Sequence, residues 1–185
     1  MEAKQTQIQI FLQTPKVQFV IPVYQRNYDW TTHQCAELLR DIISVEKESR
    51  VTHFIGSIVY LHEGIIITSE VKELVIIDGQ QRLTTINILY VALYRYAREK
   101  GLPQQEEIYN SFLTNQYVQN ESSKLKLKQT DANAVAFKAI LNGTENELDK
   151  YSNVKENFSY FKNQINEDNF TTILNGLKRL IFVEI

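Results

Sequence analysis

One segment constrains the fold more than any other: an apolar run that stops at Asp78-Gly79 and passes directly into a helical pattern. Leu74–Ile77 is β-prone and predicts a short buried strand. From Gln80, apolar side chains recur at helical spacing up to Gly101 and cover more than one stripe of the helix. This pattern predicts a central, largely buried helix. The chain is therefore expected to be built around a strand–turn–helix unit.

The rest of the sequence predicts strands mainly in the first half and helices in the second. We expect further strands over Val17–Val23, Phe54–Leu61, Ile65–Thr68, Lys124–Lys128 and 180–185. We expect further helices from Thr31 or Thr32 to about Glu48, and over Gln104–Val118, 131–142, Glu147–Asn166 and Phe170–Leu177. This order predicts an α+β fold, with a small mixed sheet and packed helices over 8–101. A mostly helical annex over 102–185 would end in a strand that returns to the sheet.

Charge and cysteine content narrow the functional class. The net charge is −2, so any DNA contact must come from a local patch. Cys35 stands alone, which excludes an internal disulfide and fits a reducing compartment. The sequence contains no signal peptide pattern and no apolar stretch near the ~20 residues of a membrane span. We expect a cytoplasmic protein with no membrane partner, and we expect the parent protein to continue beyond the apolar run at 180–185.

The start of the long helix predicts a phosphate site. Its first amides lack acceptors within the helix and lie at the positive end of the helix dipole. Arg82 can hold phosphate oxygens in a bidentate manner, and Asp78 can hold Mg²⁺ or orient a water molecule. The candidate catalytic residues are Asp78, Gln81 and Arg82. The candidate phosphate-binding residues are Gly79, Gln80, Gln81, Arg82, Thr84 and Thr85.

A structural alternative stays open for this segment, in which Asp78 caps the helix and Arg82 pairs with a core carboxylate. A second cluster precedes it along the chain. Tyr24, Gln25 and Arg26 follow a strand end and are candidates for contact with a nucleotide or DNA, whereas Tyr28 and Trp30 are expected to pack against the following helix. Gly56, inside a predicted strand, indicates a bulge or the close approach of a ligand, and it joins the candidate contact residues.

Three segments in this order resemble the N-terminal domain of GmrSD-type, modification-dependent (type IV) restriction enzymes, which belongs to the ParB/sulfiredoxin-like superfamily. They are IPVYQRNYDW, HFIGSIV and IIDGQQRLTT, and the later KLKLKQTDANAVAFKAIL and NFSYFKNQI are similar to its helical portion. The resemblance implies a ParB-like sheet and nucleoside triphosphate binding and hydrolysis at the DGQQR motif, Asp78 to Arg82, where the Asp78 carboxylate is the candidate ligand for Mg²⁺. It also implies modified DNA and a downstream nuclease domain as partners in phage defence. Sulfiredoxin chemistry is excluded because Gln80 stands where a reactive Cys would be.

The leading hypothesis is a nucleotide-hydrolysing module that regulates a downstream nuclease. The alternative is a non-enzymatic sensor of modified DNA, with a basic patch of Arg26, Lys72 and Arg82. A third reading is a nuclease, because Glu70-Val71-Lys72 is similar to half of a Glu-x-Lys motif, although a solvated turn is expected there.

Overall fold

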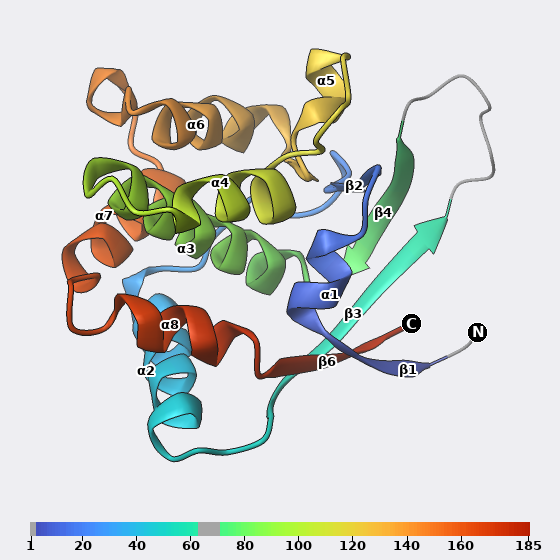
Figure 1. The fold of residues 1–185 in the computed structure, drawn as a ribbon. Helices are drawn as coiled ribbons and strands as arrows, with labels where there is room; N and C mark the ends of the chain where they lie inside the picture. The colour runs from blue at the N-terminus through green and yellow to red at the C-terminus, as the bar shows by residue number, and fades with distance from the viewer. Residues whose placement is uncertain (1–2, 63–70) are drawn as a thin grey trace.

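The computed structural model describes residues 3–62 and 71–185. Within these residues, six strands form one mixed sheet in the order β1-β6-β3-β4-β2-β5 (Figure 1). The strands β1 and β4 run antiparallel to β6 and β3 respectively, and β2 runs parallel to both β4 and β5. β6 runs parallel to β3. The strands are β1 (Lys4–Gln7), β2 (Val17–Val20), β3 (His53–His62), β4 (Lys72–Asp78), β5 (Leu127–Lys128) and β6 (Leu180–Glu184).

Helices lie to one side of this sheet, with α3 at their centre (Figure 1). α3 packs against α4 and α7, and α2 packs against α8. The helices are α1 (Ile8–Gln13), α2 (Thr32–Lys47), α3 (Gln80–Glu99), α4 (Gln104–Ile108), α5 (Glu121–Lys124), α6 (Asp131–Asn142), α7 (Asn153–Gln164) and α8 (Phe170–Leu177), with a π-helical turn at Tyr109–Leu113 and a 3₁₀ turn at Glu145–Glu147. This arrangement confirms the predicted α+β class.

The prediction that α3 is a central helix is confirmed. Fourteen of its 20 residues are buried, so it contacts neighbours around most of its circumference. Tyr90 is fully buried, and its ring stacks on that of Phe112 with the ring centroids 4.4 Å apart. No helix among the described residues combines the length and the hydropathy that crossing a bilayer requires.

The N-terminal elements β1 and α1 were not predicted from the sequence. β1 is a polar edge strand without apolar alternation, and α1 has only six residues. Tertiary contacts stabilise α1, because the Phe11 ring packs against Phe19 and Phe182 of the sheet with centroid distances of 4.6 and 4.9 Å. Such long-range aromatic packing leaves no periodic signal in a short segment.

Several predicted helices and strands are shorter in the structure. The helix predicted over Gln104–Val118 ends at Leu113, because the Asn115 amide donates hydrogen bonds to the carbonyls of Val17 (3.0 Å) and Ser123 (3.1 Å). Of the strand predicted over Lys124–Lys128, only Leu127 and Lys128 pair in the sheet as β5, because Lys124 ends the short helix α5 and the extended Leu125 bridges to Thr114 instead. Side-chain hydrogen bonds to distant backbone atoms thus override the local pattern.

Other boundaries move for similar reasons. The helix predicted over Glu147–Asn166 begins at Asn153, after a turn in which Glu145 pairs with Arg95 at 2.9 Å. β2 ends at Val20, shortly before Pro22, which cannot donate to a strand partner. β4 starts at Lys72, earlier than predicted, because β2 pairs alongside it. The strand predicted over 65–68 and the turns on either side of it fall largely outside the described residues.

The predicted domain boundary between residues 101 and 102 stays a prediction. β6 lies between β1 and β3 in the sheet, and α7 packs on α3. Side chains from both sides of that boundary therefore belong to one hydrophobic core.

Lys126 gives a stability prediction. Its side chain is 2% exposed and its ammonium donates to the Thr14 carbonyl, while burial lowers its pKa from 10.5 to about 8. Between these two values the unfolded chain binds more protons than the folded chain, so the free energy of unfolding rises with pH in this window. We expect the stability of the wild type, relative to Lys126→Met, to increase from about pH 8 to about pH 10. Urea denaturation at several pH values measures it, and a difference that is independent of pH would contradict the prediction.

Candidate functional site

The junction of β4 and α3 leaves a bare helix start. Gly79 is the N-cap residue, with φ of 88°, and no side chain caps the helix. A Cβ at Gly79 would lie 2.9 Å from the Ser57 carbonyl oxygen, so this approach requires glycine. The first helical hydrogen bond runs from Leu83 N to Gly79 O (3.0 Å), which leaves the amides of Gln80 to Arg82 without acceptors in the helix.

A bulge in β3 faces this helix start. The register between β3 and β6 shifts between Phe54 and Ser57, and Gly56 has φ of 103°. A Cβ at Gly56 would lie 2.9 to 3.0 Å from three atoms of the Arg82 guanidinium. Arg82 Nη1 donates to the Ser57 carbonyl at 3.2 Å. The predicted close approach at Gly56 is thus made by Arg82, which lies directly over the glycine.

A cavity of about 550 Å³ opens between the two segments. Its size is within the range of small-molecule sites. All of its lining residues come from the three motif segments IPVYQRNYDW, HFIGSIV and IIDGQQRLTT. They are Gln25, Arg26, Trp30, Gly56, Ser57, Ile77, Asp78, Gly79, Gln80, Gln81 and Arg82.

Arg82 has the electrostatics of an anion-binding group. Burial lowers the pKa of its guanidinium, and the nearby Asp78 carboxylate partly opposes this shift. The Asp78 Oδ1 atom accepts from Gly79 N at 2.8 Å. No carboxylate of residues 3–62 or 71–185 forms a salt bridge with Arg82. The alternative in which Arg82 pairs with a core carboxylate is therefore not supported by the described residues.

The two glutamines of the motif differ in their surroundings. The Gln81 Oε1 atom accepts from the backbone amides of Asp29 (3.0 Å) and Trp30 (3.3 Å), and its Nε2 donates to the Asn27 carbonyl (3.0 Å). Gln80 is 8% exposed and lines the cavity, and its side chain forms no hydrogen bond with another described residue. Gln81 thus positions the 27–30 loop, whereas Gln80 presents an amide to the cavity.

We expect Gln81→Ala to lower the free energy of unfolding by about 2 kcal/mol, because three hydrogen bonds are lost and backbone amides are left without acceptors. Urea denaturation measures this value. Gln80→Ala, one residue away on the same helical turn, is the matched control and should cost clearly less. Equal effects of the two variants would contradict a loop-positioning role for Gln81.

The structure does not bring Thr84 and Thr85 to the cavity. Thr84 accepts from Gln129 Nε2 at 3.2 Å. The Thr85 hydroxyl donates to the Gln81 carbonyl (2.8 Å) and meets the Tyr28 hydroxyl at 2.7 Å. Both threonines are almost completely buried. The sequence pattern predicted that both threonines lie at the exposed start of the helix. In the structure, neighbouring segments cover α3 from its second turn onward, so the threonines do not reach the cavity.

The Tyr24-Gln25-Arg26 cluster is divided. The Gln25 Nε2 atom donates to the Ile77 carbonyl at 2.9 Å, and Arg26 pairs with Asp29 at 3.3 Å, so both lie at the cavity. Tyr24 is 72% exposed and does not line it. Tyr28 is buried and Trp30 packs partly against the core, while their expected packing on the following helix stays a prediction. It was not predicted from the sequence that Trp30 and Ser57 line the cavity. The one signal for this was that they lie close in sequence to Arg26 and Gly56.

The basic patch proposed for DNA binding is not formed as expected. Lys72 begins β4 and Asp78 ends it, so at about 3.3 Å per residue Lys72 lies roughly 20 Å from the cavity. Arg26 already has Asp29 as a partner. Of the nuclease half-motif Glu70-Val71-Lys72, Lys72 lies in β4 and Glu70 is outside the described residues.

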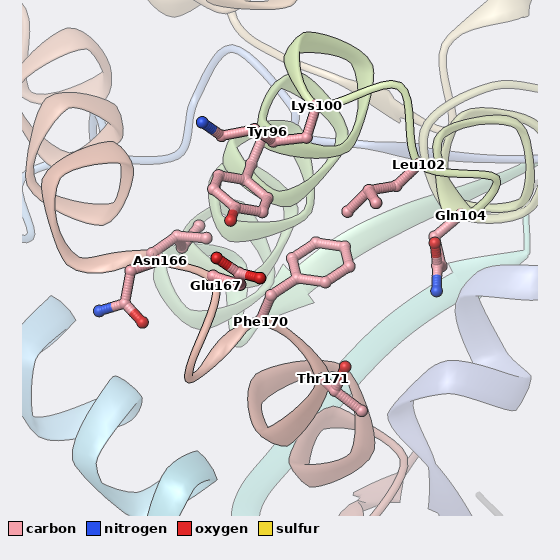
Figure 2. Close-up of a pocket in the computed structure, with 9 residues that line it drawn as sticks. Tyr96, Lys100, Leu102, Gln104, Asn166, Glu167, Phe170 and Thr171 are labelled. Atoms are coloured by element: carbon pink, nitrogen blue, oxygen red, sulfur yellow. The ribbon is translucent and has the colours of Figure 1, made fainter.

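Another cavity, of about 660 Å³, lies at the opposite end of α3 (Figure 2). The rings of Tyr96 and Phe170 line it with centroids 5.1 Å apart, and Glu167 lines the same cavity (Figure 2). A carboxylate at this place disfavours a phosphate. Lys100 on its rim therefore offers a control position remote from Arg82.

Comparison with known families identifies the chain. The sequence model of the GmrSD restriction endonuclease N-terminal domain matches residues 8–185. The chain belongs to this family. The match runs from α1 to β6, so every element around the Arg82 cavity lies inside the GmrSD N-terminal domain. This membership places the chain in a protein of a restriction system. A comparison with curated proteins found no match.

Proposed function

We propose that this GmrSD N-terminal domain binds a nucleoside triphosphate at the start of α3 and hydrolyses it to regulate a downstream nuclease domain of the parent protein. The observation that carries the proposal is the half-buried Arg82 guanidinium, which no described carboxylate pairs, beside uncapped helix amides in one cavity. Isolated buried cations are costly unless an anion accompanies them. A bound phosphate supplies that anion.

Each wall residue has a role in this proposal. The amides of Gln80 to Arg82 and the Arg82 guanidinium bind phosphate oxygens, as at other helix starts. The Gln80 side chain supplies the hydrogen bond that it does not make within the described protein. Gly56 provides the space for the guanidinium, and Gln81 acts as a positioning residue through the 27–30 loop.

Asp78 can supply a carboxylate ligand to a Mg²⁺–triphosphate site. Its side chain is exposed at the cavity wall, and among the described residues its one hydrogen-bond partner is the Gly79 amide, which donates to Oδ1. Mg²⁺ in such sites is held by one or two carboxylates together with substrate phosphates and water. No group of three or more His, Cys, Asp or Glu side chains within the described ranges forms a metal cage, so phosphate oxygens would complete the coordination. When bound, the ion would neutralise phosphate charge.

The first test is calorimetric titration of the domain and of the full-length parent protein with ATP, GTP, CTP and UTP in the presence of Mg²⁺. Binding of at least one of them, accompanied by phosphate release from the parent protein, is the expected result. If none of the four binds either protein, the proposed function is wrong.

Gly56→Ala gives a second test. The added Cβ would displace the Arg82 guanidinium, and we expect nucleotide binding to weaken on the order of tenfold, a change of about 1.4 kcal/mol. Gly143→Ala is the matched control, because Gly143 also has a positive φ, of 81°, but its Cβ would meet the nearest Arg95 atom at 3.6 Å, an ordinary contact. Both variants strain the backbone, and only Gly56→Ala should weaken binding. Similar affinities of the two variants would argue against this role of Gly56.

Modified DNA and a nuclease domain are the partners that we propose for the parent protein, with support from the family membership. The purely non-enzymatic sensor is the weaker alternative, because Lys72 lies far from Arg26 and Arg82 at the cavity and Arg26 is already paired with Asp29.

A further inference from the structure

We propose that a smaller cavity of about 240 Å³, next to the phosphate site, holds the nucleobase of the same nucleotide. This inference rests on the proposed function. The cavity lies between α2 and the beginning of β3, and it is lined by Trp30, Gln34, Glu37, Leu38, Asp41, His53, Phe54, Ile55 and Arg82.

The two cavities are neighbours. They share Trp30 and Arg82, so these two side chains stand at the boundary between them. Along β3, residues 53–55 line the smaller cavity, and Gly56 and Ser57 line the larger one. Consecutive residues of β3 thus line both cavities, and the β-bulge between Phe54 and Ser57 lies where one cavity meets the other. A single nucleotide can reach both, with phosphates on one side of Arg82 and the base on the other.

Aromatic and apolar groups make the smaller cavity suitable for a flat ring. Phe54 is 57% exposed, so its ring is not used by the hydrophobic core. Trp30 is half-buried at the boundary, and Leu38 and Ile55 are buried beneath. A nucleobase stacked on such an aromatic side chain gains about 1–3 kcal/mol.

Charge decides which part of the nucleotide lies where. Gln34, Glu37 and Asp41 follow one another at helical spacing and line the cavity from α2. Glu37 and Asp41 lie 3.5 Å from His33 and His53 respectively, and their carboxylates retain capacity for further donors. Two carboxylates repel phosphates and accept hydrogen bonds from the amino or imide N–H groups of a base. The larger cavity, with Arg82 and the helix amides, has the opposite preference.

The test compares two ligands, inorganic tripolyphosphate and the tightest-binding of the four nucleoside triphosphates, each with Mg²⁺. Phe54→Ala should weaken nucleotide binding on the order of tenfold, which corresponds to about 1.4 kcal/mol, and leave tripolyphosphate binding unchanged. Arg82→Ala should weaken the binding of both ligands. Leu61→Ala is the matched control, since Leu61 lies on the same strand with a similar exposure of 56% but lines neither cavity. It should bind both ligands as the wild type does.

The outcomes separate this inference from the proposed function. If the wild type binds the nucleotide and Phe54→Ala binds it equally well, the base subsite is wrong and the phosphate site stands. The base subsite is also wrong if Phe54→Ala weakens the two ligands to the same extent. If the wild type binds neither ligand, the proposed function fails and the base subsite fails with it.

Discussion

Arg82→Ala is expected to weaken nucleoside triphosphate binding on the order of 100-fold or more, and to abolish hydrolysis. The variant removes charge-assisted, bidentate hydrogen bonds from a partly desolvated site, and each such bond contributes about 1.5–3 kcal/mol. Arg82→Lys should recover only part of the affinity, because an ammonium keeps the charge but lacks the planar fork that lies over Gly56. Titration calorimetry and a phosphate-release assay measure the two effects.

Two controls accompany the Arg82→Ala experiment: the melting temperature of the variant, and a substitution at the other end of α3. Since no described carboxylate pairs with Arg82, its removal leaves no unpaired charge behind and costs one hydrogen bond, to the Ser57 carbonyl. The melting temperature of Arg82→Ala should therefore stay close to that of the wild type. Lys100→Ala removes a cation from the other end of α3 and should bind nucleotide normally. Unchanged affinity in Arg82→Ala would remove the basis of the proposed function.

The largest expected effect on stability comes from Gly176→Ala. α8 packs so closely on α2 at this position that a Cβ would clash with the Ile42 carbonyl oxygen and lie 2.7 Å from Ile42 Cγ2. Ile42 is completely buried, and backbone atoms of a helix cannot move aside as a flexible side chain can. We expect the free energy of unfolding to fall by about 3 kcal/mol or more, since the helices must separate or distort.

Thermal unfolding measures this change. In a chain of this size, about 1 kcal/mol lowers the melting temperature by roughly 2–4 °C, so a decrease of roughly 6–12 °C is expected. Lys178→Ala is the control, because that residue follows α8 directly and is exposed. A melting temperature of Gly176→Ala equal to that of the control would show that α8 moves on α2 at little cost.

Much of the core unit was predictable from local patterns. The apolar run of β4, the break at Gly79 and the all-round burial of α3 follow from strand propensity, glycine geometry and helical periodicity. These signals depend on residues that are close in sequence. They also placed Asp78 and Arg82 at the helix start, where the structure has them beside the cavity.

Roles that depend on distant partners were not predictable. Gln81 was grouped with phosphate ligands, but its hydrogen-bond partners lie more than 50 positions earlier in the chain. Thr84 and Thr85 were assigned to the same ligand set, and the structure surrounds them with Gln129 and Tyr28. α1 is stabilised by the packing of Phe11 on Phe19 and Phe182 of the sheet, and the local sequence pattern does not predict this contact.

The sequence by itself determined the strand–glycine–helix unit and the positive charge at its junction, because both depend on neighbouring residues. Only the tertiary structure decided which polar side chains of that unit face a cavity and which hold the fold together. The physical reason is that side-chain hydrogen bonds and close packing join segments far apart in the chain. The position of the Arg82 guanidinium over Gly56 is one example, since it depends on contact between β3 and α3, including the hydrogen bond to the Ser57 carbonyl.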